Sequence, residues 1–289
     1  MKRKSVLRNF FGVASLAIGL GALSAGATII VDESFNYSIG NISGNNGGTG
    51  WNTDSGQGGV AWAGADSTVA SPGLGFYGIG AGNSVTIGQA FEIGSISRDI
   101  AVQTLSSGTL WMRALYSPGT ANPDPGANPN YLFTFQMNFA NGGAITVQRE
   151  QDDTFGLNTA AAGAQGDFSL GAFLSGQNSH LLLWRLGLST TGGDTLDMWV
   201  DPTVTSQGAL ESLTPTVQLT GLNLVSGTDD YFTSFQAEGM VDKLDEIRIG
   251  NDFADVTPVP EVGSFLWGGL LVAGVGLREW RRRAKMAKS

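Results

Sequence analysis

Short runs of alternating apolar and polar residues dominate this chain, and turns rich in Gly, Asn, Ser and Thr separate them. The clearest runs are residues 131–140, 180–188 and 195–201. In the first of them, Phe133 and Phe135 alternate with polar residues. A period of two is typical of β-strands with one buried face, and no convincing helical periodicity competes with it. The pattern predicts an all-β domain with about ten or more short strands, arranged as a sandwich or a barrel.

Turn formers connect two of these runs directly. Residues 189–194 have the sequence Ser-Thr-Thr-Gly-Gly-Asp, which predicts a hairpin between the strands on either side. The remaining strands are expected at Thr28–Val31, Val85–Ile87, Ile100–Leu105, Leu110–Tyr116, Ala144–Arg149, Val217–Leu219 and Leu244–Gly250.

Charge is distributed unevenly along the 289 residues. The whole chain has a formal net charge of −9, but residues 28–260 contain 6 basic and 23 acidic residues, whereas both ends are basic. With no Cys and one His, the chain cannot build a Cys-based metal or redox site. The acidic middle disfavours nucleic acid and acidic lipid as partners. About 230 residues are enough to bury a core without disulfides.

The N-terminus has the order of a secretory signal peptide. Basic residues at 2–8 precede an apolar run over 10–23, and Ala25-Gly26-Ala27 then supplies a cleavage site of the A-x-A type. We therefore expect a signal helix over residues 1–27, export through the Sec translocon, and cleavage after Ala27. A retained membrane anchor is the alternative, and the apolar run is short for it because a spanning helix needs about 20 residues.

The C-terminus has the order of a membrane anchor. Residues 256–262 form a Pro-punctuated linker, and residues 263–277 contain no charge. A basic cluster follows at once, formed by Arg278, Arg281, Arg282 and Arg283. An apolar helix that ends in such a cluster predicts a single transmembrane helix over 263–283, with residues 284–289 in the cytoplasm. The alternative is a buried C-terminal helix of the globular domain, which the linker and the arginines disfavour.

This C-terminal region resembles the PEP-CTERM sorting domain. Val259, Pro260 and Glu261 match the start of its Val-Pro-Glu-Pro pattern, Val262 replaces the second Pro, and the apolar helix and Arg cluster match the rest. The resemblance implies recognition by an exosortase, a membrane-embedded Cys transpeptidase. It also implies anchoring in the inner membrane before processing, and then a place at the cell surface or in the extracellular matrix of an exopolysaccharide-making bacterium.

The domain at residues 28–255 resembles a concanavalin A-like, LamG-type jelly-roll β-sandwich. Residues 31–37, followed by Gly50-Trp51, look like its first strand, and the hairpin containing residues 197–202 looks like its central strand pair. Residues 242–250 look like its last strand, which in that family lies beside the first. Many such domains hold calcium, which accepts oxygen ligands from flexible loops. The acidic residues of the predicted loops make calcium a possible cofactor here: Asp152, Asp153, Asp194, Asp229 and Asp230.

Three motifs have catalytic counterparts in other proteins. Residues 73–78 match G-x-G-x-x-G, but a dinucleotide site needs a helix after this loop, and Ile79-Gly-Ala-Gly-Asn cannot form one. His180 has no nucleophile motif near it, so we expect it at a strand start without a chemical role. Asp245 and Glu246 are adjacent, so we expect them on opposite faces of a solvated strand end rather than as a hydrolase pair. The sequence therefore predicts a protein that is not an enzyme.

Trp199 is the best candidate for ligand binding. If Leu196 and Met198 face the core, then Asp197, Trp199 and Asp201 face outward. A Trp ring flanked by carboxylates suits a sugar ring, which is apolar on one face and hydroxylated at its rim. In the alternative interpretation, Trp199 packs under a loop or between the sheets.

These observations predict an exported surface or matrix protein with a non-catalytic role, either structural or carbohydrate-adhering. The alternative is a secreted enzyme that acts on polysaccharide, which would require two carboxylates facing one concave groove. A purely structural protein without any ligand is a third possibility.

Overall fold

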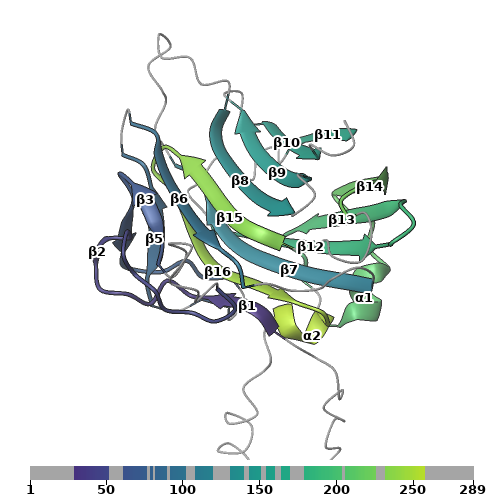
Figure 1. Cartoon of the computed structure of the whole chain (residues 1–289), viewed down its shortest axis with the longest axis horizontal. Coiled ribbons are helices and arrows are strands. Elements are labelled where there is room, and N and C mark those ends of the chain that lie inside the picture. The colour runs from purple at the N-terminus through teal and green to yellow at the C-terminus, as the bar shows by residue number, and fades with distance from the viewer. Residues whose placement is uncertain are drawn as a thin grey trace, which may run out of the picture.

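The computed structural model describes residues 29–51, 61–76, 79–80, 82–89, 92–101, 108–119, 131–139, 143–150, 154–159, 164–169, 179–203, 206–225 and 232–257. These residues form two antiparallel sheets that lie face to face (Figure 1). The nine-stranded sheet has the order β14 (Val217–Leu222), β13 (Asp194–Val200), β12 (His180–Leu188), β7 (Gly108–Ser117), β16 (Asp242–Gly250), β5 (Ser84–Ile87), β4 (Thr68–Ala70) and β2 (Gly40–Asn41), with β1 (Ile29–Glu33) also paired to β16. The seven-stranded sheet has the order β11 (Ala164–Ser169), β10 (Thr154–Thr159), β9 (Ala144–Glu150), β8 (Tyr131–Phe139), β15 (Phe232–Gly239), β6 (Gly94–Asp99) and β3 (Ala63–Ala65).

The core lies between the two sheets and follows from the alternation in the sequence. Phe133, Phe135 and Met137 of β8 point inward and are buried, as is Trp184 of β12 in the opposite sheet. The rings of Phe135 and Trp184 stack with centroids 5.4 Å apart, which joins the two layers. The all-β sandwich that the sequence predicts is therefore confirmed.

Several predicted elements are found within one or two residues. The strand expected at 180–188 is β12, and the strands expected at 131–140 and 195–201 are β8 and β13. β12 and β13 pair as the predicted hairpin. β1 pairs with β16, as expected for the first and last strands. Of the strand expected at 100–105, only residues 100–101 are described, and the neighbouring strand β6 ends at Asp99.

Two short helices that the sequence analysis did not find cover the outer face of the nine-stranded sheet. Helix α1 (Gln207–Glu211) begins after Ser206, whose hydroxyl accepts from Ala209 N. Helix α2 (Phe253–Val256) begins with a capping box formed by Asp252 and Asp255. The globular domain therefore includes Val256, which the sequence analysis placed in the linker.

The predicted terminal segments lie outside the described residues. This applies to the signal helix with Ala25 and Ala27, to the sorting motif at 259–261, and to the apolar helix with its Arg cluster. Within the described part of the chain, no helix is long and apolar enough to cross a membrane.

Candidate functional site

A grid of polar side chains covers the outer face of the seven-stranded sheet; we call it the polar face. Inside β8 and β15, the buried residues Phe133, Phe135, Met137, Phe235 and Ala237 are each followed by a polar residue that points away from the core. The pairing register aligns these residues across four strands, so that Gln136 lies opposite both Gln236 and Thr146. The described, partly exposed polar members are Ser95, Ser97, Asp99, Thr134, Gln136, Asn138, Thr146, Ser234, Gln236 and Glu238; Gln148 lies in the same register but is buried.

Hydrogen bonds between neighbouring side chains hold part of this grid in place. Gln136 donates to Asn138, and Asn138 Nδ2 donates to Ser234 Oγ at 3.0 Å. Gln236 Nε2 donates to Glu238 Oε1 at 2.9 Å. Amide and hydroxyl groups both donate and accept hydrogen bonds. The polar face therefore presents an ordered set of groups complementary to ligands rich in hydroxyls.

The two described carboxylates of the polar face are far apart. Asp99 lies opposite Ser234, and Glu238 lies four residues further along β15. At roughly 3.3 Å per residue this separation is about 13 Å. The carboxylates of a glycoside hydrolase lie about 5 to 9.5 Å apart. This pair is therefore too widely spaced for that chemistry.

Trp199 is buried on the opposite side of the molecule, and the prediction that it is exposed is wrong. The alternation places it on the outer side of the nine-stranded sheet, as expected, but only 3% of it is exposed. Its ring stacks on Trp111 with centroids 6.3 Å apart, and Leu210 of α1 and Phe253 of α2 complete the cluster. The two helices occupy the surface that a sugar ring would need.

The carboxylates beside Trp199 are bound to protein groups, so the prediction that they form the rim of a sugar site is also wrong. Asp197 accepts from Arg185 Nε at 3.1 Å and from Gln218 Nε2 at 2.8 Å. Asp201 accepts from Leu181 N at 2.8 Å and lies 2.8 Å from His180 Nδ1. His180 is the first residue of β12, which confirms its predicted position.

Asp194, one of the calcium candidates, is the first residue of β13 and is fully buried, not a loop residue. Its carboxylate accepts from Ser189 N at 2.7 Å, Leu224 N at 2.7 Å and Val225 N at 3.1 Å. These backbone donors occupy the oxygens that a cation would need. The other candidates, Asp152, Asp153, Asp229 and Asp230, lie outside the described residues. The described residues contain no group of three or more His, Asp or Glu that could hold a metal ion.

The acidic residues of β16 are buried, which corrects the expectation of a solvated strand end. β16 lies inside the nine-stranded sheet between β7 and β5, so Asp242 and Asp245 are both fully buried. A bulge after Asp245, with Glu246 at a φ of 51°, brings these two neighbours to the same outer side. There Glu246 binds Arg113 at 2.8 Å, and Asp245 Oδ2 accepts from Leu74 N at 2.9 Å.

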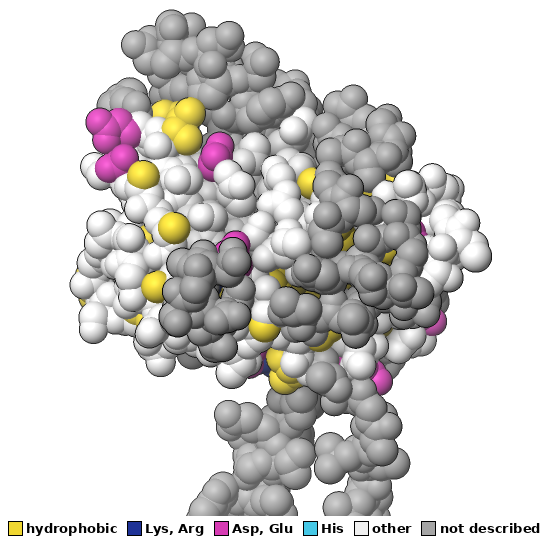
Figure 2. Space-filling view, in the orientation of Figure 1, with side chains coloured by type: hydrophobic (Ala, Val, Ile, Leu, Met, Phe, Trp, Pro, Cys, Tyr) yellow, Lys and Arg dark blue, Asp and Glu magenta, His cyan; other side chains and the backbone are white. Residues whose placement is uncertain are grey.

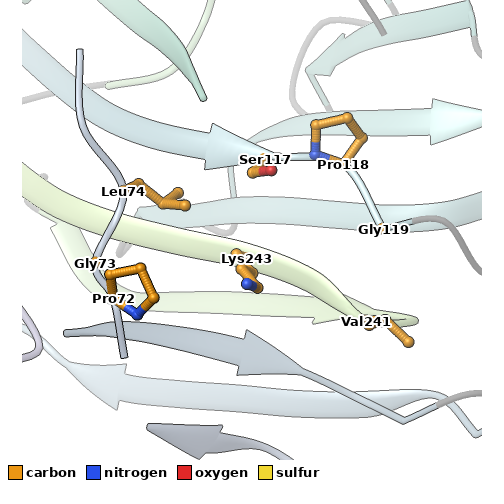
Figure 3. Close-up of a pocket in the computed structure, with 8 residues that line it drawn as sticks. All are labelled: Pro72, Gly73, Leu74, Ser117, Pro118, Gly119, Val241 and Lys243. Atoms are coloured by element: carbon orange, nitrogen blue, oxygen red, sulfur yellow. The ribbon is translucent and has the colours of Figure 1, made fainter. Parts of the chain in front are cut away.

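A pocket of about 230 Å³ lies on the outer side of the nine-stranded sheet, next to this part of β16 (Figure 3). No sequence signal pointed to it, because its walls come from three distant segments. It is lined by Pro72, Gly73, Leu74, Ser117, Pro118, Gly119, Val241 and Lys243. The Gly-rich motif at 73–78 contributes one wall. Phe76 and Ile79 exchange backbone hydrogen bonds there as an isolated bridge. The described residues of 73–80 belong to no strand and no helix, so the strand expected there is not found.

Comparisons with known proteins find structural similarity only at low sequence identity. No protein-family model matches the chain, and no curated protein matches it. Among solved structures, a carbohydrate esterase from the Shiga toxin-encoding bacteriophage phi24B has a TM-score of 0.43 at 12% identity, over 78% of this chain and 100% of that one. An endo-1,3-β-glucanase from Streptomyces sioyaensis has a TM-score of 0.41 at 11% identity, over 78% and 96%. The exoplasmic/lumenal domain of VIP36 has a TM-score of 0.35 at 11% identity, over 70% and 87%. Likenesses of this size do not assign an activity to this chain.

Proposed function

We propose that this chain is an exported, non-catalytic protein with a concanavalin A-like jelly roll, and that it adheres to carbohydrate through the polar face. The observation on which the proposal rests is the aligned grid of amides, hydroxyls and carboxylates on that sheet. Its described apolar members are alanines, at positions 63, 65 and 144. Sugar hydroxyls need many donors and acceptors on one surface, and this face supplies them.

The spacing of the carboxylates supports a binding role rather than a catalytic one. Asp99 and Glu238 are about 13 Å apart along the strand direction. They can each accept a hydrogen bond from a sugar hydroxyl, but they cannot act on the two sides of one glycosidic bond. His180 and Asp201 are paired with each other on a different part of the molecule.

The charge of the domain supports a neutral or cation-bridged partner. On the side of the molecule seen in Figure 2, the coloured side chains include several acidic ones and scarcely any basic ones, in keeping with 23 acidic and 6 basic residues over 28–260. Such a surface repels polyanions at long range. Neutral polysaccharide is therefore the first class of ligand to test.

The position of the two chain ends supports display from a membrane. Ile29 pairs with Gly250, and α2 follows directly, so the described segment begins and ends at neighbouring places on the nine-stranded sheet (Figure 1). A domain held through residue 257 would thus turn the polar face away from its point of attachment. We propose export through the Sec translocon, anchoring in the inner membrane, and sorting by an exosortase-type transpeptidase at Val259-Pro260-Glu261 to the cell surface or matrix.

Two experiments test these proposals. The secreted protein on a glycan array should bind neutral polysaccharide fragments, and an array without any bound glycan would overturn the carbohydrate proposal. Mass spectrometry of the extracellular protein should find it without residues 265–289. Recovery of those residues in the mature extracellular form would overturn sorting by cleavage and leave the carbohydrate proposal in place.

A further inference from the structure

The pocket on the nine-stranded sheet contains a cation, Lys243, that has no ion pair among the described residues. All six basic residues of positions 28–260 are described, and five of them are arginines paired with carboxylates. The pairs are Arg98 with Glu33, Arg113 with Glu246, Arg149 with Asp242, Arg185 with Asp197 and Glu211, and Arg248 with Asp32. Lys243 is the sixth, and it forms no ion pair with any described carboxylate. In so acidic a domain, this isolated cation marks the pocket as a place for an external anion.

Two buried carboxylates fix the walls on either side of Lys243. They are its neighbours in β16, at positions 242 and 245. Asp242 Oδ1 accepts from Gly119 N at 3.1 Å, which holds the wall formed by Pro118 and Gly119. Asp245 Oδ2 accepts from Leu74 N at 2.9 Å, which holds the opposite wall. The pocket is thus shaped by the folded strand itself, without a ligand.

Close backbone contacts make both walls depend on glycine. A Cβ atom on Gly119 would lie 2.4 Å from Met240 O, and one on Gly73 would lie 2.8 Å from Asp245 Oδ2. Val241, which also lines the pocket, has a φ of 64°, an uncommon conformation for a β-branched residue. Strained and tightly approached backbone is often found at binding sites.

The carboxylates near Lys243 do not neutralise it. Burial raises the pKa of Asp245 from 3.8 to about 8, so its side chain is mostly uncharged at pH 7. Asp242 points to the other side of the sheet, where Arg149 lies 3.0 Å from it. A negative charge in the pocket would therefore find Lys243 available.

The other lining groups indicate what kind of anion fits. Figure 3 shows Lys243 and Ser117 on neighbouring strands, with Pro72, Gly73 and Leu74 on one side and Pro118 and Gly119 on the other. The proline rings and the Leu74 side chain are apolar, and Ser117 adds a hydroxyl. The volume of about 230 Å³ is below the range of roughly 300 to 1,000 Å³ that drug-sized ligands occupy, so one ring fits and a chain of rings does not.

We propose that this pocket binds the carboxylate of a single uronic-acid-type sugar unit, with Lys243 as its charge partner and Ser117 as a hydrogen-bond partner. The site is separate from the polar face and goes beyond the proposed function, because it recognises one acidic unit instead of a neutral surface of hydroxyls.

The test uses the full-length chain labelled with ¹⁵N and titrated with sodium glucuronate, glucose, acetate or inorganic phosphate. Glucuronate should shift the amide signals of Gly73, Leu74 and Gly119 at concentrations at which the other three compounds have little effect. The absence of these shifts would overturn the proposal. Equal binding of glucose would overturn the role of charge, and equal binding of acetate or phosphate would overturn the sugar assignment.

Variants of Lys243 provide a second arm. Lys243→Met should weaken glucuronate binding at least tenfold, and Lys243→Arg should retain most of it. Arg248→Met, which makes the same charge change on the same strand, is the control and should bind like the unchanged protein. Unchanged binding by Lys243→Met would contradict the proposal. Because the titrations use the unchanged protein as well, the test stands even where a variant loses stability.

The experiments distinguish failure of the glucuronate-pocket proposal from failure of the proposed function. The glycan array reports on neutral polysaccharide at the seven-stranded sheet, whereas the amide shifts report on positions 73, 74 and 119 beside the nine-stranded sheet. A chain that binds neutral glycans but not glucuronate would keep the first proposal and lose the second.

Discussion

Trp199 shows that the side of the sheet on which a side chain lies does not determine whether that side chain is exposed. The alternation of β13 fixes which side of the sheet the ring takes, because successive side chains point to opposite faces. Its burial depends on Leu210 and Phe253, which belong to other segments of the chain. The sequence could therefore predict the direction of Trp199 but not the helices that cover it.

Trp199→Ala should lower the free energy of unfolding by about 3–5 kcal/mol, because it removes a large buried ring from a packed cluster. Urea unfolding measures this loss. Polysaccharide binding by the folded variant should stay unchanged, since the ring is on the side away from the polar face. Full stability combined with lost polysaccharide binding would show instead that Trp199 contacts the ligand.

Asp245 should make stability depend on pH between about 4 and 8. Its pKa is raised from 3.8 to about 8 by burial, so the folded state keeps a proton that the unfolded chain releases above pH 4. The stabilising contribution is complete below pH 4 and is lost as the pH rises through 8, at no more than about 1.4 kcal/mol per pH unit.

Urea unfolding at pH 5 and pH 8 tests this prediction. The unchanged protein should be less stable at pH 8, and Asp245→Asn should show a smaller difference between the two pH values. An equal difference in both proteins would mean that Asp245 does not hold the proton.

At the scale of elements, the clearest predictions came from strands with marked alternation, whereas β6 and β15 were missed. β8, β12 and β13 have a large apolar residue at nearly every second position. β6 has the sequence Gly-Ser-Ile-Ser-Arg-Asp, in which the buried Arg98 and the small residues conceal the period. β15 was missed because a bulge near Thr233 interrupts its alternation.

Neither the two helices nor the pocket could be predicted from the sequence, because no local pattern indicates them. Helices of 5 and 4 residues are too short to show a period of 3.6. The pocket joins residues 72–74, 117–119 and 241–243, and only the sheet pairing brings these together. The polar face was visible in part, because the polar half of β8 was read from the sequence, but its alignment with β15 and β6 depends on register.

The hairpin between β12 and β13 depends on Asp194 through three backbone hydrogen bonds. Asp194→Ala would leave the N–H groups of Ser189, Leu224 and Val225 without their acceptor, at a cost of about 2–4 kcal/mol. Thermal and urea unfolding should show this loss equally with calcium and with a chelator. A loss seen only in the presence of calcium would assign Asp194 to a metal site.

At the scale of the whole molecule, the two sheets have different surfaces. Part of the nine-stranded sheet is covered by α1, α2 and residues 72–76 and 79–80, and the described segment begins and ends beside this sheet. The seven-stranded sheet presents the polar face on the opposite side (Figure 1). This division leaves one broad side for a large hydroxylated ligand and one small pocket for an acidic group.

The retention of the protein on immobilised neutral polysaccharide tests the central claim most directly. The double variant Gln136→Ala/Gln236→Ala removes the two amides that face each other at the middle of the polar face. Gln207→Ala removes an exposed amide from α1, on the other side of the molecule, and is the control. The double variant should stay folded but bind about tenfold more weakly, or worse, because each hydrogen bond lost to the ligand costs roughly 0.5–1.5 kcal/mol. Retention of the double variant equal to that of the control would contradict carbohydrate binding through this face.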